Sequence, residues 1–361
     1  MRVLSVVGAR PQFVKLAPVD QALRERGHEH VIVHTGQHYD RLLSQAFFDD
    51  LGICEPAVNL RVGPAGRLGA ILGRLDPVLA GAAPDWVLVY GDTDSTLGGA
   101  LAAAQRHFPL AHLEAGVRSF DRRMAEERNR VVTDHVSDLL LAPSRNAVRN
   151  AAAEGLAART VLTGDVMADV LAATRARVAA APARYLPPGL RTGPYLLATV
   201  HRAETTDDPG RLADTLRALA ALPVPVRLLA HPRLADRAAR LSLPLSAGAV
   251  EAHSPLSYPG MIAALLTCDG LVTDSGGLQK EALLLGVPCT TLRPVTEWPE
   301  TLPGGWNVLV PQPRDLAAAV TRSRPAGPAP QPYGDGASAP RVVAELATRA
   351  GDRERAGVAW P

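Results

Sequence analysis

The segment "LVTDSGGLQKEALLLGVP", residues Leu271–Pro288, decides the fold. Its apolar run ends in Asp274-Ser275-Gly276-Gly277 and passes directly into a stretch with helical spacing. A buried strand, a glycine turn and a helix in this order make the first part of a βα unit. Glycines let a ligand approach the backbone, and the free N–H groups of the first helical turn favour a phosphate there. An ordinary helix N-cap is the alternative interpretation of the same residues.

The strand-then-helix pattern recurs along most of the chain. It predicts an α/β protein with two Rossmann-like doubly wound domains that face a cleft, a GT-B-type fold. We place the domains at residues 1–175 and 190–335, with a Pro/Gly-rich linker at 176–195 and a last helix within 336–361 that packs back on the first domain. The predicted strands lie within residues 3–8, 30–36, 86–92, 110–116, 138–144, 160–165, 195–201, 226–231, 248–254, 270–277, 288–294 and 307–311.

Composition excludes several classes of protein. The chain has 361 residues, of which 47% are hydrophobic and 20% charged, and its net charge is +2. A nearly neutral chain predicts neither a nucleic-acid partner nor a basic membrane anchor, and no apolar run approaches the roughly 18 residues that cross a bilayer. Cys54, Cys268 and Cys289 lack metal-ligand spacing, so we expect reduced thiols, no metal site and a cytoplasmic location.

Polar residues close the predicted strands, and in open α/β sheets ligands bind outside these ends. Arg10 and Lys15 flank the first strand–helix junction, where two cations suit a pyrophosphate; a solvated helix start is the alternative. Lys15 and Lys280 are the only lysines of the chain, and we expect Lys280 to lie at the surface. The other polar residues at strand ends are Gln37, His38, Asp92, Glu114, His201, His231, Asp274 and Ser275.

Seven segments together resemble the non-hydrolysing UDP-N-acetylglucosamine 2-epimerase family. They occur in the family's order over most of the chain, whereas each alone is modest support. The resemblance implies a UDP-sugar in the cleft, a homodimer, no cofactor, and inversion at C2 by elimination of UDP to a glycal and its re-addition. The segments are "GARPQFVKLAPV", "HTGQHYD", "VYGDTDSTLGGALAA", "HLEAGVRSFDRRMAEERNRVVTDH", "TVHRAETTDD", "TDSGGLQKEALLLGVPC" and "LRPVTEWPETLPGGWNVLV".

The resemblance also implies roles for individual residues. Asp92, Glu114 and Glu126 match the family's catalytic carboxylates, and His201 matches the histidine beside the leaving phosphate. The substrate-binding residues that we predict are Arg10, Lys15, Gln37, His38, Arg130, His231, Ser275, Gly276, Gly277, Glu281 and Arg293.

Each role has a structural alternative. Asp92 could cap a helix, and Glu126 with Glu127 could be an exposed helix start. Glu114 follows a buried strand, where a charge is costly unless it has a partner. His201 and His231 close apolar strands and could be core histidines with their hydrogen bonds satisfied.

The sequence leaves the identity of the sugar open. The residues of several segments are closer to one branch of the family, which includes epimerases of UDP-2,3-diacetamido-2,3-dideoxyglucuronate. Arg118, Arg122, Arg123 and Arg130 could accept a uronate carboxylate, although surface arginines are the simpler interpretation. Asp40 stands where an amide is common in the family, so we expect weak or absent activation by UDP-GlcNAc.

Three other functions compete with this one. A GT-B glycosyltransferase shares the fold but needs no cluster of carboxylates in its first domain. A hydrolysing 2-epimerase begins with the same elimination, and a sensor of nucleotide sugars would bind without turnover.

Overall fold

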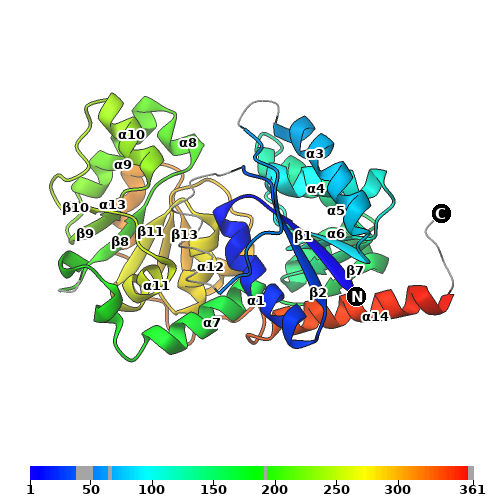
Figure 1. Ribbon diagram of the computed structural model, residues 1–361. Coiled ribbons are helices and arrows are strands. Elements are labelled where there is room, and N and C mark those ends of the chain that lie inside the picture. Colours follow the sequence, from blue (N-terminus) through cyan, green and yellow to red (C-terminus); the bar gives the residue numbers. More distant parts are fainter. Residues whose placement is uncertain (38–51, 64–66, 191–192, 357–361) are drawn as a thin grey trace. The chain divides into compact units, whose positions relative to one another are not determined.

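The computed structural model describes residues 1–37, 52–63, 67–190 and 193–356, apart from the side chains of Arg10 and residues 353–356 (Figure 1). The chain divides into two compact units. Unit 1 comprises Met1–Val170 and Pro332–Pro361, and unit 2 comprises Leu171–Gln331. The segment expected to be a linker is partly helical, because α7 (Val166–Val178) continues into it and two short 3-10 turns follow, Pro182–Tyr185 and Pro188–Leu190.

Unit 1 contains a parallel sheet of seven strands among the described residues, in the order β3-β2-β1-β4-β5-β6-β7. The order runs outward from β1 in both directions, as in the doubly wound dinucleotide-binding fold. Its strands are β1 (Arg2–Val7), β2 (Glu29–His34), β3 (Val58–Asn59), β4 (Trp86–Tyr90), β5 (Leu110–Leu113), β6 (Leu139–Ala142) and β7 (Thr160–Leu162).

Helices cover both faces of this sheet. Leu4 and Val6 of β1 pack with α3 and α4, whereas Val3 and Val7 pack with α1 and α14. The alternation follows from the two-residue period of a strand, and apolar residues on both faces explain why the strands are continuous hydrophobic runs. The helices are α1 (Arg10–Glu25), α3 (Arg67–Ala82), α4 (Asp94–Gln105), α5 (Ala125–Val136), α6 (Arg145–Ala153) and α14 (Ser338–Ala356).

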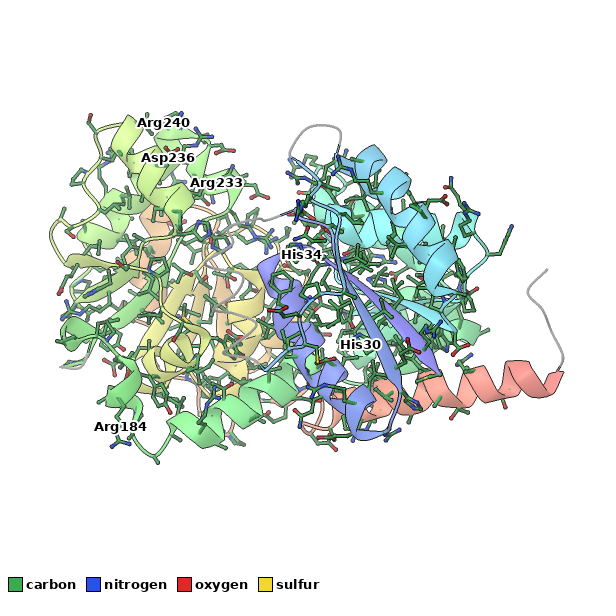
Figure 2. The ribbon with its side chains drawn as sticks, viewed as in Figure 1. His30, His34, Arg184, Arg233, Asp236 and Arg240 are labelled. Carbon is green, nitrogen blue, oxygen red and sulfur yellow. The ribbon has the colours of Figure 1, made fainter. Side chains whose placement is uncertain are left out.

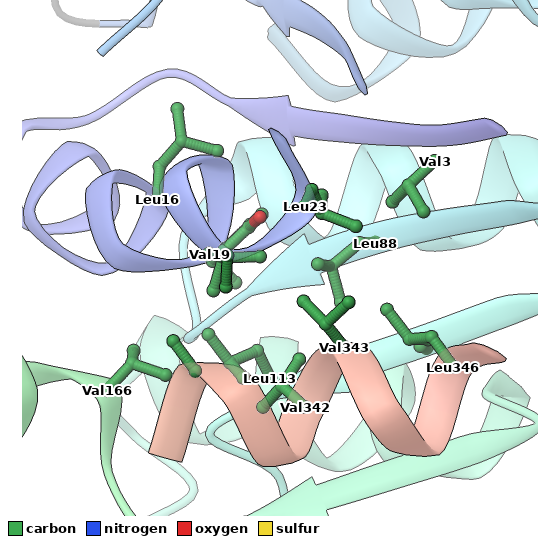
Figure 3. Close-up of a cluster of buried hydrophobic side chains, with 14 of the residues drawn as sticks. Val3, Leu16, Val19, Leu23, Leu88, Leu113, Val166, Val342, Val343 and Leu346 are labelled. Carbon is green, nitrogen blue, oxygen red and sulfur yellow. The ribbon is translucent and has the colours of Figure 1, made fainter. Parts of the chain in front are cut away.

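The last helix is part of the core of unit 1. Figure 3 shows Val342, Val343 and Leu346 of α14 among the buried side chains that include Val3 and Leu88 of the sheet. The indole Nε1 of Trp86 also donates a hydrogen bond to the carbonyl of Leu346 at 3.0 Å. The chain therefore returns to its first unit after completing the second.

Unit 2 repeats the same topology without an internal sequence repeat. Its parallel sheet has six strands among the described residues, in the order β10-β9-β8-β11-β12-β13. The predicted α/β, Rossmann-like architecture is thus confirmed for both units. The strands are β8 (Leu196–Thr199), β9 (Val226–Leu229), β10 (Val250–His253), β11 (Gly270–Thr273), β12 (Cys289–Thr291) and β13 (Asn307–Leu309).

Helices again lie on both faces. One face carries α9, α10 and α13, and the other carries α11 and α12. Among the described residues, none of the helices is both long and apolar enough to cross a membrane. The helices are α8 (Ala203–Thr206), α9 (Pro209–Ala220), α10 (Pro232–Arg240), α11 (Tyr258–Thr267), α12 (Gly276–Leu284) and α13 (Leu316–Val320).

The strand order changes direction at two points, between β1 and β4 in unit 1 and between β8 and β11 in unit 2. Connections leave such a point toward opposite faces of the sheet, which opens a crevice at the carboxyl ends of the two strands. Asp92 follows β4, and Asp274 follows β11. Asp92 and Asp274, two of the polar strand ends predicted from the sequence, therefore lie beside the switch points of their own sheets.

Candidate active site

Asp92 lies in the turn between β4 and α4, and two neighbours restrain it. Its carboxylate forms an ion pair with Arg130, and its carbonyl accepts a hydrogen bond from Asn129 Nδ2 at 3.0 Å. The Asp92 side chain is 25% exposed, so it can still meet a ligand. Helix α4 is capped by Thr93, which excludes the alternative that Asp92 is the N-cap.

Glu114 lies at the end of β5, and its carboxylate has a buried partner. Lys15 of α1 donates from Nζ to Glu114 Oε1 at 2.6 Å. Glu114 has φ of +72°, a left-handed conformation that non-glycine residues adopt at a cost. Lys15 is buried, so the alternative of a solvated helix start is wrong for it.

The first turn of α5 carries two carboxylates with different surroundings. Glu126 is half-buried, and in the part of the chain that the structure describes its side chain has no hydrogen bond or ion pair. Glu127 is buried and accepts hydrogen bonds from Ser119 N, Ser119 Oγ and Phe120 N. Burial tends to raise the pKa of Glu127, but these bonds and the charge of Arg130 outweigh it and hold the pKa below its usual range. The exposed helix start that we considered is therefore wrong for Glu127.

Two arginines near these carboxylates are buried, contrary to the expectation of surface side chains. Arg130 bridges Asp92 and Glu127, with Nη1 3.0 Å from Glu127 Oε2. Arg118 pairs with Asp134 at 2.7 Å and with Glu154 at 2.7 Å. A buried guanidinium is stabilised where its planar set of N–H groups meets carboxylates, and this is the case for both Arg118 and Arg130.

The β1–α1 turn is closed by a glutamine. Gln12 Oε1 accepts from the backbone N–H groups of Gly8 and Ala9, at 2.8 and 3.0 Å, so these donors are engaged within the protein. Gln37 Oε1 accepts from Ser95 Oγ at 2.6 Å at the start of α4. The backbone of Arg10 begins α1, but its side chain lies outside the described part, as do His38 and Asp40.

In unit 2, His201 follows β8 and is held by Asp274. The carboxylate of Asp274 is fully buried, lies 3.1 Å from His201 Nδ1, and also accepts the backbone N–H groups of His201 and Arg202. Burial tends to raise the pKa of Asp274, but His201 and these N–H groups hold it below its usual range. The imidazole is 35% exposed, which makes the alternative of a core histidine wrong for His201.

His231 is the N-cap of α10 and is exposed, so it is not a core histidine either. Its ring lies against that of His201, with 5.4 Å between the ring centroids. Arg233, labelled in Figure 2, donates from Nε to Thr206 Oγ1 at 2.8 Å and so links α10 to α8. The two histidines are thus carried on neighbouring, linked segments.

The glycine turn that opens the Leu271–Pro288 segment leads into α12 as predicted. Ser275 is the N-cap residue, but its side chain makes no capping hydrogen bond. A side chain at Gly276 would place its Cβ 2.3 Å from Oε1 of Glu297, so only glycine fits here. Glu297 is buried between Arg202 and Arg293, with Arg293 Nη1 2.7 Å from its Oε2.

Two further residues of α12 are buried. Glu281 accepts a hydrogen bond from Tyr258 OH at 3.0 Å. The expectation that Lys280 lies at the surface is wrong, because it is 2% exposed and its Nζ lies 3.7 Å from the centroid of the Trp298 ring. An ammonium over an indole face is a favourable cation–π contact, which the sequence spacing does not reveal.

The sequence analysis also missed residues that connect the site. His112 and Asp134 stand in quoted segments but were not singled out, because neither closes a strand. Glu297 was missed because it is distant in sequence from the glycine turn that it touches. A signal was present for His112, which is a polar residue inside the otherwise apolar strand β5, two residues before Glu114.

Two Rossmann-like units define an enzyme of the GT-B-type nucleotide-sugar class: one has Asp92 at its switch point and Glu114 after the next strand, and the other has a histidine–aspartate pair and a glycine helix start. A family model described as "UDP-N-acetylglucosamine 2-epimerase" matches residues 21–347. The chain belongs to the UDP-N-acetylglucosamine 2-epimerase family.

Individual relatives agree with this assignment. The chain is 42% identical over 361 residues to UDP-2,3-diacetamido-2,3-dideoxy-D-glucuronate 2-epimerase of Pseudomonas aeruginosa, covering 96% of this chain and 99% of the relative. It is 39% identical to a UDP-N-acetylglucosamine 2-epimerase homolog of Methanococcus maripaludis, with 96% and 99% covered. The crystal structure of Methanocaldococcus jannaschii UDP-GlcNAc 2-epimerase in complex with UDP-GlcNAc and UDP is similar, with a TM-score of 0.88, 33% identity, and 96% and 100% covered.

Proposed function

We propose that the protein inverts C2 of a UDP-activated 2-acetamido sugar. UDP is eliminated to give a glycal and is then added back, so that the product is again a UDP-sugar. The observation that carries the proposal is the set of carboxylates that follow neighbouring strands or open the next helix of unit 1, in a chain of the 2-epimerase family: Asp92 after β4, Glu114 after β5 and Glu126 in the first turn of α5.

The reaction explains why several carboxylates are needed. The C2 hydrogen is a very weak acid. When the anomeric C–O bond breaks, C1 gains oxocarbenium character, and this makes the C2 hydrogen more acidic. One group then takes the proton and another returns it to the opposite face of the ring. Asp92 pairs with Arg130 and Glu114 pairs with Lys15, whereas Glu126 has no ion pair among the described residues. Such different surroundings suit an acid and a base in one site.

In our proposal unit 2 binds the UDP that departs. Ser275, Gly276 and Gly277 offer backbone N–H groups at the start of α12 to the diphosphate, and Glu281 accepts from the ribose hydroxyls. His201 lies beside the leaving phosphate; Asp274 faces its Nδ1, which leaves Nε2 for the phosphate oxygen. The remaining substrate contacts that we propose are Arg10, Lys15, Gln37, His38, Arg130, His231 and Arg293.

We further propose the 2,3-diacetamido uronate as the sugar, because the relative with 42% identity carries that substrate in its name. Of the four arginines considered for the uronate carboxylate, Arg118 and Arg130 already pair with buried carboxylates, and Arg123 pairs with Asp121. Arg122 is exposed and has no ion pair among the described residues. Arg122 is therefore the arginine that we assign to the uronate.

Incubation with each UDP-sugar in deuterium oxide tests the reaction. The expected product is a 2-epimeric UDP-sugar with deuterium at C2, formed faster from the diacetamido uronate than from UDP-GlcNAc. Release of free sugar and UDP would mean a hydrolysing enzyme, and transfer to an acceptor without exchange at C2 would mean a glycosyltransferase. Binding of UDP-sugar without either reaction would leave a sensor.

Substitution of the carboxylates tests their roles. Asp92→Asn and Glu126→Gln are each expected to lower kcat by about 10²–10⁴-fold while UDP still binds, since general acid–base groups contribute on this scale. Asp76→Asn is the control, because Asp76 lies on α3 and pairs with the exposed Arg106, which follows α4. Turnover at the wild-type rate in either site variant would remove that residue from the mechanism.

The family resemblance also supports a proposal on the oligomeric state and the place of action. We propose that the enzyme is a cytoplasmic homodimer of polysaccharide biosynthesis. Sedimentation equilibrium over a range of concentrations tests the dimer, and a constant monomer mass would exclude it.

A further inference from the structure

We propose that His112 and Asp134 are positioning residues that together hold the two loops bearing Asp92 and Glu114. The proposal rests on the catalytic roles proposed for these two carboxylates. Neither His112 nor Asp134 lies at the end of a strand, and both side chains are fully buried in unit 1.

His112 of β5 reaches the loop after β4. Its Nε2 lies 2.7 Å from the carbonyl oxygen of Gly91, the residue before Asp92, and its Nδ1 lies 2.6 Å from Oδ1 of Asp134. The two ring nitrogens of His112 therefore contact the loop after β4 and helix α5 at the same time.

Asp134 of α5 extends the connection to the loop after β5. Its Oδ2 accepts the backbone N–H of Gly116 at 3.0 Å and pairs with Arg118 Nη1 at 2.7 Å. Burial tends to raise the pKa of Asp134, but the charges and hydrogen bonds of His112 and Arg118 hold it below its usual range. Arg118 in turn pairs with Glu154, so one buried guanidinium serves two carboxylates.

The loop after β5 needs such a restraint because Glu114, which is not a glycine, has a left-handed backbone. Gly91 and Gly116 have φ of +64° and +75°, and Glu114 has φ of +72°. Left-handed conformations of a non-glycine residue persist where the surroundings over-determine them. His112 contacts the carbonyl of Gly91, and Asp134 accepts the N–H of Gly116. The hydrogen bond between His112 and Asp134 connects one loop to the other. Catalytic geometry is sensitive to such ties, since a displacement of about 1 Å can cost about 10²-fold in rate.

Two isosteric variants separate the two ends of the imidazole. In His112→Gln the amide nitrogen takes the place of Nε2 and keeps the bond to Gly91, whereas in His112→Asn it takes the place of Nδ1 and keeps the bond to Asp134. We expect His112→Asn to lower kcat by about 10²-fold and His112→Gln by less than about tenfold, with KM and the Kd for UDP nearly unchanged in both. A kcat of His112→Asn at the wild-type level would overturn the proposal, as would equal losses of kcat in the two variants.

Amide hydrogen exchange gives a readout that does not depend on the reaction. Exchange of the segment around Gly91 and Asp92 is expected to accelerate in His112→Asn but not in His112→Gln, and that of residues 114–116 to accelerate in Asp134→Asn. Unchanged exchange in both segments would contradict the positioning role even if activity fell. If the wild-type enzyme gave no exchange at C2 of any UDP-sugar, the proposed function would fail, whereas the amide exchange pattern would still decide this inference.

Discussion

The ammonium nitrogen of Lys15 lies 2.6 Å from Oε1 of Glu114, and both side chains are only 8% exposed. A Cβ added to Gly91 would lie 3.0 Å from that nitrogen, so the ion pair sits directly beside the residue that precedes Asp92. The first helix of the chain therefore supplies a charge to the strand ends that carry the proposed catalytic carboxylates. Each of the two charges is stable in this buried place only while the opposite charge of its partner compensates it.

The Lys15–Glu114 pair is expected to be strongly coupled. Lys15→Met or Glu114→Gln alone should lower the free energy of unfolding by about 3–5 kcal/mol, because each substitution removes the ion-pair partner of the buried residue that remains. The double variant should lose less than the sum of the two, as a denaturant-based double-mutant cycle would reveal.

The exposed pair Arg106–Asp76 is the matched control, and no measurable coupling is expected for it. Additive losses at Lys15 and Glu114 would mean that their contact contributes nothing to folding.

Glu127 predicts a pH dependence of stability with a definite sign. Its pKa in the folded protein is lower than the ordinary value of 4.5, so its contribution is present above that value and is lost as the pH falls through the folded pKa. Glu127→Gln should cost about 3 kcal/mol at pH 7, with the difference from wild type constant above about pH 5 and shrinking below about pH 4.

Glu126→Gln serves as the comparison, because it removes the neighbouring carboxylate, which has no partner among the described residues. Its free energy of unfolding should follow that of the wild type over the whole pH range. A loss of stability in Glu127→Gln that became larger as the pH fell would contradict the predicted sign.

Gly276→Ala tests the start of α12. The new methyl carbon would lie 2.3 Å from Glu297 Oε1 and 3.2 Å from Trp298 Nε1, and Arg202 and Arg293 hold that carboxylate in place. We expect the Kd for UDP to rise about tenfold or more, an effect of roughly 1.4 kcal/mol, measured by titration calorimetry.

The control is Gly73→Ala in α3, where the added carbon meets no described atom within 4 Å apart from its chain neighbours and the backbone of its own helix. This variant should bind UDP as the wild type does and gain about 0.5–1 kcal/mol of stability, since alanine favours a helix over glycine. Unaltered UDP binding in Gly276→Ala would remove the helix start from the proposed site.

Leu346→Ala tests whether α14 supports unit 1. Leu346 is fully buried in that core, so its truncation should lower the free energy of unfolding by about 2–5 kcal/mol. The slowest-exchanging amides of β1 and β4 report this loss without mixing in the unfolding of unit 2. Leu162→Ala, at a leucine 43% exposed on β7, should change little, and equal losses in the two variants would mean that α14 contributes no core.

How much the sequence could reveal depends on the range of the interaction. Hydrophobic runs such as "WVLVY" and the glycine turn before Leu278 are local patterns, and they correctly predicted parallel strands and the start of α12. Motif order identified the family, and it placed Asp92, Glu114 and His201 at the ends of strands. Lys280 and Arg118 were misjudged, because the partners that bury them, Trp298 and Asp134, are not marked by any spacing.

Sequence alone determined the alternation of strands and helices, because the two-residue and 3.6-residue periods of apolar side chains are written in consecutive positions. Only the tertiary structure decided which charges meet. Lys15 and Glu114 are 99 positions apart, and His112 reaches Gly91 across 21. Parallel strand pairing brings such residues to one edge of the sheet, and burial then makes a compensating partner obligatory. The pattern of partners is therefore a property of the fold, even where each residue type could be recognised beforehand.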